Sequence, residues 1–261
     1  MFELADIRFA WPDAPPVLDG VSFSVRAGEK LVLLGANGCG KSTLLKLING
    51  LVHGQAGSYR YLKEDVTPAR MKSGAWARRF RSEVVLLFQH PEAMLFNPTV
   101  RDEIAYGPRQ LGLPDAEARA VHWAAALGLL PLLDKAPFAL SGGQKQKVAL
   151  AAILSLEPRA LLLDEPTASL DPRASGWLVD FLLDCGKTVV VSTHNLSMAA
   201  ELGERCLVLG EAGRILYDGP LGDALRDRAL LESANLVHRH RHRHGGVEHA
   251  HTHSHEWESS R

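Results

Sequence analysis

The segment GANGCGKST, residues 35–43, constrains the fold more than any other part of the chain. It matches the pattern GxxxxGK[ST] and stands between a continuous apolar run and a segment of helical pattern. Its glycines allow the backbone to curl so that several N–H groups point at one anion, and the helix N-terminus adds partial positive charge. The segment therefore predicts a phosphate-binding loop, with an ordinary glycine-rich turn as the alternative.

Individual side chains of this loop have separate predicted roles. Lys41 supplies a mobile cation for the β- and γ-phosphates of a nucleotide, and Ser42 offers a hydroxyl to Mg²⁺. Cys39 lies where the helix and lysine fields lower a thiol pKa, so we predict a reactive cysteine that bound nucleotide protects. The predicted nucleotide site comprises Gly35, Ala36, Asn37, Gly38, Cys39, Gly40, Lys41, Ser42 and Thr43.

Five continuous apolar runs predict the core of the fold. They begin at Leu31, Val84, Ala160, Thr188 and Cys206, and each is of the kind found in strands covered on both faces. Helical patterns separate several of them, which predicts an α/β fold with a mainly parallel sheet and right-handed crossovers. Apolar residues alternate before position 26, which predicts half-buried strands there.

The chain divides into a large domain and a tail. We predict one domain over residues 1–235, with an inserted helical subdomain at about 91–145, where strand patterns are lacking. After Asn235 the sequence becomes HRHRHRHGGVEHAHTHSHEWESSR, which has no apolar period. We therefore expect residues 236–261 to form a disordered tail.

Composition excludes several classes of protein. The formal net charge of -1 creates no general field for nucleic acid, so we expect no nucleic-acid partner. No apolar run approaches the ~18 residues of a membrane span, and the acidic, alternating N-terminus is unlike a signal peptide. The cysteines at 39, 185 and 206 are widely spaced and odd in number, which favours a reduced, cytosolic setting.

Paired acids follow the third apolar run. Asp164 and Glu165 stand at its end, and consecutive strand residues point to opposite sides. One carboxylate can therefore serve Mg²⁺ while the other faces an attacking water. We assign Asp164 to the metal and Glu165 to the water, as general base or orienting group. A solvated turn before Pro166 is the alternative.

The sequence LSGGQ, residues 140–144, opens a helix. Ser141 is a typical N-cap, and the N–H groups of Gly142 and Gly143 make an anion site at the helix start. The alternative is simply a capped helix.

Together these motifs resemble the ABC ATPase family. In the family's order, GANGCGKST looks like Walker A, Gln89 like the Q-loop, LSGGQ like the signature, LLLDEPTASLD like Walker B and the D-loop, and His194 like the switch histidine. The resemblance covers most of residues 1–235. It implies a P-loop NTPase fold with an N-terminal antiparallel β-subdomain, and hydrolysis of ATP with Mg²⁺.

The family resemblance also implies a pair of domains, either a homodimer or a pair with a related ATPase subunit, packed head to tail around two ATP molecules. Ser141, Gly142, Gly143 and Gln144 then reach the γ-phosphate held by the other domain's Lys41, and Asp171 crosses the interface. Gln89 approaches Mg²⁺ and relays its state to a membrane subunit, while His194 holds the γ-phosphate and water in line. Trp11 stands where the family stacks an aromatic on adenine, although a strand-edge tryptophan is the alternative.

The segment FQHPEAMLFNPTVRDEIAYGPRQLGL resembles ATPases of energy-coupling-factor importers, which take up vitamins or Co²⁺ and Ni²⁺. Met94 departs from the glutamine that is common in that family. Leu95, Phe96 and Pro98 form an apolar knob that suits contact with a helix of an integral membrane subunit, or packing inside the helical subdomain. We expect a location at the cytoplasmic face of the cell membrane, reached through such subunits.

Histidines in the tail favour metal import within that branch. Imidazole suits Ni²⁺, Co²⁺ and Zn²⁺, and arginines interleave with the first four histidines, so the later group is the better ligand set: His249, His251, His253 and His255. A tag or a solvated linker is the alternative. We predict a cobalt or nickel importer ATPase, against a vitamin-importing ATPase, a zinc importer ATPase or a soluble ABC ATPase.

Overall fold

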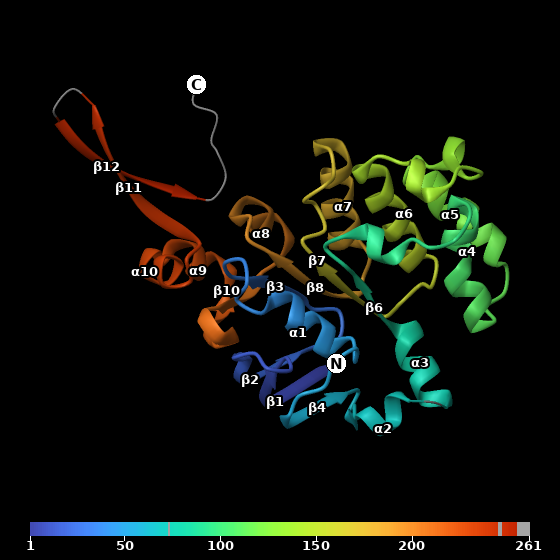
Figure 1. Cartoon of the computed structure of the whole chain (residues 1–261), viewed down its shortest axis with the longest axis horizontal. Helices are drawn as coiled ribbons and strands as arrows, with labels where there is room; N and C mark the ends of the chain where they lie inside the picture. The colour runs from blue at the N-terminus through green and yellow to red at the C-terminus, as the bar shows by residue number, and fades with distance from the viewer. Residues whose placement is uncertain (73, 245–246, 255–261) are drawn as a thin grey trace.

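The computed structural model describes the backbone of residues 1–72, 74–244 and 247–254, and side chains as far as Val237, except that of Ala212. A six-stranded sheet in the order β10-β9-β3-β8-β7-β6 forms its centre (Figure 1). Its strands are β3 (Lys30–Leu34), β6 (Val84–Leu87), β7 (Ala160–Asp164), β8 (Thr188–Thr193), β9 (Arg205–Leu209) and β10 (Ile215–Pro220). Only the β10–β9 pair is antiparallel. The five apolar runs are five of these strands, which confirms the α/β fold.

A second, antiparallel sheet has the order β2-β1-β4-β5. It comprises β1 (Phe2–Ala10), β2 (Pro16–Val25), β4 (Ala56–Tyr61) and β5 (Glu64–Asp65). Its apolar side chains share one core with α1 (Lys41–Ile48), which lies between the two sheets (Figure 1). This is the antiparallel N-terminal subdomain that the family resemblance implies.

Strand β3 shows why the central strands are apolar throughout. Leu31 and Leu33 belong to the core shared with α1 and the antiparallel sheet, whereas Val32 and Leu34 belong to the core on the opposite face. Because successive strand residues point to opposite faces, a strand covered on both sides is apolar at most of its positions.

Helices cover the sheet and form the inserted subdomain, and none among the described residues is long and apolar enough to cross a membrane. Besides α1, they are α2 (Pro68–Met71), α3 (Ala75–Glu83), α4 (Val100–Leu111), α5 (Ala116–Ala126), α6 (Gly142–Leu154), α7 (Pro172–Asp184), α8 (Leu196–Leu202), α9 (Leu221–Arg226) and α10 (Arg228–Ser233), with 3₁₀ turns η1 (Pro91–Met94), η2 (Leu130–Leu132), η3 (Pro137–Ala139) and η4 (Glu211–Gly213). Helices α4, α5 and α6 stand together at one end of the molecule, beyond β6 (Figure 1).

The disorder expected of residues 236–261 stays a prediction. Two antiparallel strands, β11 (Val237–His244) and β12 (Val247–Ser254), pair in a hairpin after α10 (Figure 1). Residues that alternate in chemistry have the period of a strand, which suits the pairing of these two segments.

Candidate functional site

The phosphate loop connects β3 to α1 and requires glycine at two close approaches. A Cβ at Gly40 would lie 2.8 Å from the carbonyl oxygen of Val17, and one at Gly35 would lie 2.5 Å from Cys39 Sγ. Gly40 also has φ +106°, a conformation that L side chains rarely adopt. Lys41 Nζ donates to the carbonyl oxygens of Gly35 and Ala36, at 2.7 and 3.1 Å, and so lies folded against the loop.

A pocket of about 460 Å³ opens over this loop. It collects residues from four separate parts of the chain: Trp11, Val17, Asn37, Gly38, Gly40, Lys41, Ser42, Thr43, Gln89, Asp164 and Glu165. The structure thus brings six of the nine Walker A residues, the Q-loop glutamine, both acids and Trp11 to one cavity. Gly35, Ala36, Cys39 and His194 are not among the residues that line it. The pocket lies at the carboxyl ends of β3 and β7, where ligands bind in parallel α/β sheets.

The two buried acids have different partners. Asp164 Oδ1 accepts a hydrogen bond of 2.5 Å from Ser192 Oγ, whereas Glu165 Oε1 lies 2.9 Å from His194 Nδ1 and 3.8 Å from Lys41 Nζ. A buried carboxylate without partners is costly, so these contacts stabilise both groups. The arrangement supports separate tasks for the two acids.

We expected strand alternation to separate the two acids, but Glu165 lies outside the strand. Strand β7 ends at Asp164, and Glu165 has the left-handed φ of 46°. Its N–H lies 3.2 Å from both the carbonyl oxygen and Oγ of Ser192, which holds the turn. A strained turn, fixed by a neighbouring strand, therefore directs Glu165 towards Lys41 and His194.

Ser192 is a residue of the candidate site that sequence reasoning missed, because it contacts both acids. It lies at the carboxyl end of β8 and is paired in register with Asp164. The available signal was a polar residue closing a buried apolar run, TVVVS, two positions before His194. Only the order of strands in the sheet shows that Ser192 lies beside Asp164.

The donors around this pocket fit Mg²⁺. Ser42 offers a hydroxyl, Asp164 a carboxylate and Gln89 an amide oxygen, and all three line the same cavity. Hard oxygen ligands are those that Mg²⁺ prefers in proteins. With nucleotide, the ion supplies charge neutralisation at the β- and γ-phosphates.

Trp11 lies at the rim of this pocket and is 40% exposed. Its ring meets Phe9 edge-on at 5.0 Å, and Lys46 Nζ lies 5.9 Å from its centroid. Its place supports stacking on a base, which stays a prediction.

The signature and D-loop residues form a different surface. Ser141, Gly142, Gly143, Gln144 and Asp171 line none of the 460 Å³ pocket. A capping box starts α6, in which Ser141 Oγ accepts from Gln144 N–H and Gln144 Oε1 accepts from Ser141 N–H.

Contacts join this helix to the D-loop. A Cβ on Gly143 would lie 2.9 Å from the carbonyl oxygen of Ser169, and Gln146 Nε2 donates to the carbonyl oxygen of Pro166 at 3.1 Å. Asp171 caps α7 through Ala174 N–H. The signature and the D-loop are therefore positioned as one unit.

The structure corrects the expectation for Cys39. Its side chain is 8% exposed, and burial raises the pKa of its thiol despite the opposing field of Lys41. The thiolate fraction at neutral pH is therefore smaller than in an exposed cysteine and grows only as pH rises towards the raised pKa.

At pH 7 we expect a maleimide to modify half-buried Cys185 first, with Cys39 and Cys206 reacting slowly. Burial raises the pKa of Cys206 to about 11, so it shares the low reactivity of Cys39. Peptide mass mapping after timed labelling checks the order, and Cys185→Ala should lose the fast phase. Labelling of Cys39 first would contradict the burial argument.

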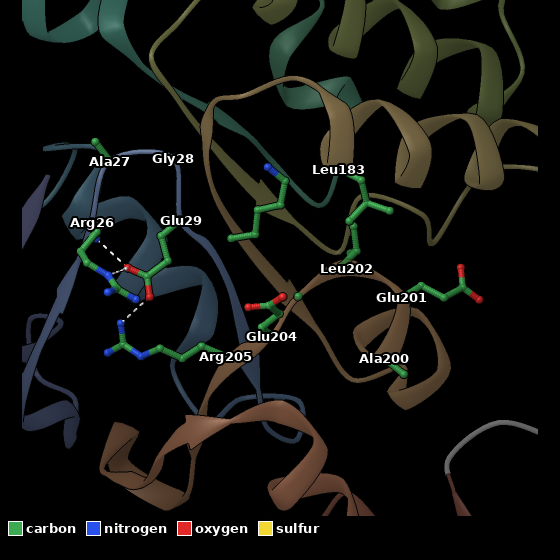
Figure 2. Close-up of a pocket in the computed structure, with 12 residues that line it drawn as sticks. Arg26, Ala27, Gly28, Glu29, Leu183, Ala200, Glu201, Leu202, Glu204 and Arg205 are labelled. Atoms are coloured by element: carbon green, nitrogen blue, oxygen red, sulfur yellow. Dashed lines mark hydrogen bonds and ion pairs between the residues drawn. The ribbon is translucent and has the colours of Figure 1, made fainter.

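A larger pocket, of about 760 Å³, lies at the opposite edge of the sheet, where β3 and β9 begin (Figure 2). Burial would raise the pKa of Glu29 there, but hydrogen bonds from Arg26 N–H and Arg205 hold it below its ordinary value. Arg205 also binds Asp218. This network ties strand ends together and lies at the amino edge of the parallel strands, so the 460 Å³ pocket is the better nucleotide site.

Comparisons with known proteins show the family of this chain. A family model described as ABC transporter matches residues 18–168. The nickel import ATP-binding protein NikO of Rhodobacter capsulatus is 41% identical over 244 residues, which cover 90% of this chain and 95% of that protein. Among solved structures, cbiO1 from Clostridium perfringens, part of the ABC transporter complex cbiONQ, has a TM-score of 0.73 at 27% identity, covering 90% of this chain and 94% of its own.

A second solved structure is the dimeric ATP-binding cassette MJ0796 bound to ADP and Pi. It has a TM-score of 0.74 at 25% identity and covers 85% of this chain and 99% of its own. The chain belongs to the ABC transporter family, as an ATP-binding domain with ATPase activity. Within that family it is similar to ATPases of energy-coupling-factor and nickel systems, as its Q-loop segment predicted.

Proposed function

We propose that this chain is the ATP-hydrolysing subunit of an importer for nickel or cobalt ions. The observation that carries the catalytic part is that Lys41, Glu165 and Gln89 line one pocket, with His194 in contact with Glu165. The loop amides and Lys41 bind the phosphates, and Ser42, Asp164 and Gln89 hold Mg²⁺. Glu165 orients or deprotonates the water, and His194 fixes that carboxylate and the γ-phosphate.

Two cassettes complete each site in this proposal. The signature helix of one chain contributes nothing to its own pocket, so its anion-binding end is available to a second chain. The dimeric form of MJ0796 supports this arrangement. The second cassette is another copy or a related ATPase subunit.

A groove beside α1 suits a helix from a membrane subunit. It has a volume of about 680 Å³ and is lined by Asn49, Gly50, Leu51, His53, Pro68, Met71, Lys72, Arg81, Val84, Val85, Leu86 and Ile153. Leu51 is 56% exposed there. Because the groove includes β6, which leads directly to Gln89, a docked helix would act on the nucleotide pocket through one short strand.

Of the apolar residues that follow Gln89, one packs inside the subdomain and another is exposed to solvent. Leu95 packs against the core, whereas Phe96 is 67% exposed and meets Tyr106 edge-on at 4.9 Å. The buried carboxylate of Glu103 accepts from the N–H groups of Phe96 and Asn97, at 2.8 and 2.6 Å, and so fixes this turn. We propose that Phe96 contacts a membrane subunit at the cytoplasmic face.

The choice of ion depends on the Q-loop resemblance and the tail. The strand register places three histidine pairs opposite one another, namely His238 with His253, His240 with His251, and His242 with His249. The side chains of these histidines, and the whole of His255, lie outside the described residues. A vitamin importer of the same branch is the alternative; a zinc importer ATPase or a soluble ABC ATPase is less favoured.

Purification from its own membranes through an N-terminal tag tests the transport proposal. We expect membrane subunits to accompany the chain, and vesicles holding the complex to accumulate Ni²⁺ or Co²⁺ with ATP.

Deleting residues 238–261 should spare ATPase activity but remove most Ni²⁺ and Co²⁺ binding in calorimetric titration of the isolated subunit. That binding should weaken below about pH 6, because protonated imidazole has no donor lone pair.

Uptake of a vitamin without metal would favour the alternative importer. Equal metal binding with and without the tail would reduce the tail to a linker. The Glu165→Gln complex is the matched control, since it should bind metal through the tail yet accumulate none.

A further inference from the structure

The turn between β9 and β10 spans residues 210–214, and its described residues are not among those that line the 460 Å³ pocket. The N–H of Gly210 closes the turn by donating to the carbonyl oxygen of Arg214 at 2.9 Å. The strand that leads into it already touches the phosphate loop, because a Cβ on Gly35 would lie 2.7 Å from the carbonyl oxygen of Leu209. The turn is therefore continuous with a strand that meets the loop.

Gly213 brings this turn against Val17, a residue of β2 that does line the pocket. A Cβ on Gly213 would lie 2.1 Å from the carbonyl oxygen of Val17 and 3.1 Å from the Cα of Leu18. Gly213 also has φ +62°, a conformation that L side chains rarely adopt. Both the close approach to β2 and the backbone conformation therefore require glycine at this position.

The same carbonyl oxygen of Val17 also meets the phosphate loop. A Cβ on Gly40 would lie 2.8 Å from that oxygen, and Gly40 is the N-cap of α1, directly before Lys41. The backbone of Val17 is thus in close contact with one glycine of the loop and one glycine of the turn. Atoms packed this closely do not move independently, so a shift of the turn is passed on to Val17.

An ion pair holds the turn on β2. Arg214 donates from Nε and Nη2 to Asp19 Oδ2, at 2.9 and 2.5 Å, and this hydrogen bonding lowers the pKa of Asp19. Arg8 of β1 lies 3.7 Å from the other carboxylate oxygen. Because Asp19 is two residues from Val17 in the same strand, the pair fixes the turn beside the residue that lines the pocket.

We propose that Gly213 and Arg214 are positioning residues for nucleotide binding, which act through Val17. The inference rests on the nucleotide site of the proposed function and adds to it a segment that lies outside the pocket. The catalytic residues Glu165 and His194 follow β7 and β8, and β3 separates these strands from β9 in the sheet. A change in the turn should therefore alter nucleotide affinity and leave the hydrolytic step nearly as it is.

Gly213→Ala tests the inference, with Gly186→Ala as the matched control. Gly186 has nearly the same φ, +61°, but a Cβ there would meet nothing within 4 Å. Both substitutions therefore place alanine in the same unfavourable backbone conformation, and only Gly213→Ala disturbs the contact with Val17. We expect Gly213→Ala to raise the monomer's Kd for ADP and the KM for ATP about tenfold, because positioning is sensitive to shifts of about 1 Å. The kcat should stay within about twofold, and Gly186→Ala should change none of the three by more than that.

Arg214→Gln is a second variant that keeps both glycines in place. Because the ion pair is exposed, we expect a rise of about threefold in the Kd for ADP, and Arg214→Lys should recover part of it by keeping the charge. The control is Arg226→Gln, which breaks an exposed pair with Asp223 at 2.6 Å in α9, outside the pocket lining. That variant should bind ADP as the parent does.

Calorimetric titration with ADP, steady-state hydrolysis and thermal unfolding distinguish the outcomes. If Gly213→Ala and Gly186→Ala lose the same Tm and both bind ADP as the parent does, the turn is only structural and the inference is overturned. A lower kcat at unchanged KM would also overturn it, because the turn would then act on hydrolysis. Should Gly213→Ala fail to fold, an unchanged Kd in Arg214→Gln decides against the inference. A parent that binds no ADP would instead overturn the nucleotide site of the proposed function.

Discussion

Glu165→Gln is expected to reduce ATP hydrolysis by about 10²–10⁴-fold while preserving ATP binding, because it removes a general base and retains its shape. In the structure Glu165 Oε1 lies 2.9 Å from His194 Nδ1 and 3.8 Å from Lys41 Nζ, beside the phosphate loop. With hydrolysis blocked, dimers should accumulate with MgATP. Phosphate release and size-exclusion chromatography with light scattering measure the two effects.

The exposed carboxylate of Glu201 provides the control for that experiment. Glu201→Gln removes the same charge away from the 460 Å³ pocket and should keep turnover near that of the parent. Near-normal turnover in Glu165→Gln would show that another group activates the water. Loss of ATP binding would instead indicate that Glu165 mainly positions Lys41.

Ser141→Arg should stop turnover and leave nucleotide binding by the monomer intact. Ser141 caps α6 and lines none of its own nucleotide pocket, so its contribution is expected in the other subunit's site. Mixing it with Lys41→Ala protein should restore at most one competent site in each mixed dimer. Steady-state hydrolysis across mixing ratios tests this, because activity should appear in mixtures of two proteins that are separately inactive.

Loss of the cap itself needs a separate control, since removing an N-cap costs about 1 kcal/mol of stability. Asp227 caps α10 through Leu230 N–H, far along the chain from the signature. Asp227→Arg should therefore reproduce the loss of a cap while hydrolysis continues. If Ser141→Arg abolishes ATP binding by monomers, the two-subunit assignment is wrong.

Local sequence predicted the parts of this site that depend on neighbouring residues. The phosphate loop follows from glycine spacing between a strand and a helix, and the start of α6 follows from Ser141 and Gln144, which satisfy each other's backbone. The central strands were predictable because burial on both faces leaves a continuous apolar run. The shorter elements β4, β10, α2 and α3 carry weaker patterns, and no specific prediction covered them.

Other features were decided by contacts between distant segments. Sheet order places Ser192 beside Asp164 and thereby sets the turn that aims Glu165, although the residues are 28 positions apart. Burial by the surrounding core raises the pKa of Cys39, where the sequence predicted a lowered one, since desolvation outweighs the nearby lysine.

By itself the sequence determined the class of this protein, its phosphate loop and the identity of its acids, because these depend on spacing along one segment. Only the tertiary structure decided that Trp11, Gln89 and the acids share one cavity and that the signature surface lies outside it. It also decided that Gly40 and Gly213 meet the same carbonyl oxygen of Val17. The physical reason is that desolvation and long-range hydrogen bonding depend on which segments pack together, and no pattern within one segment records its neighbours in space.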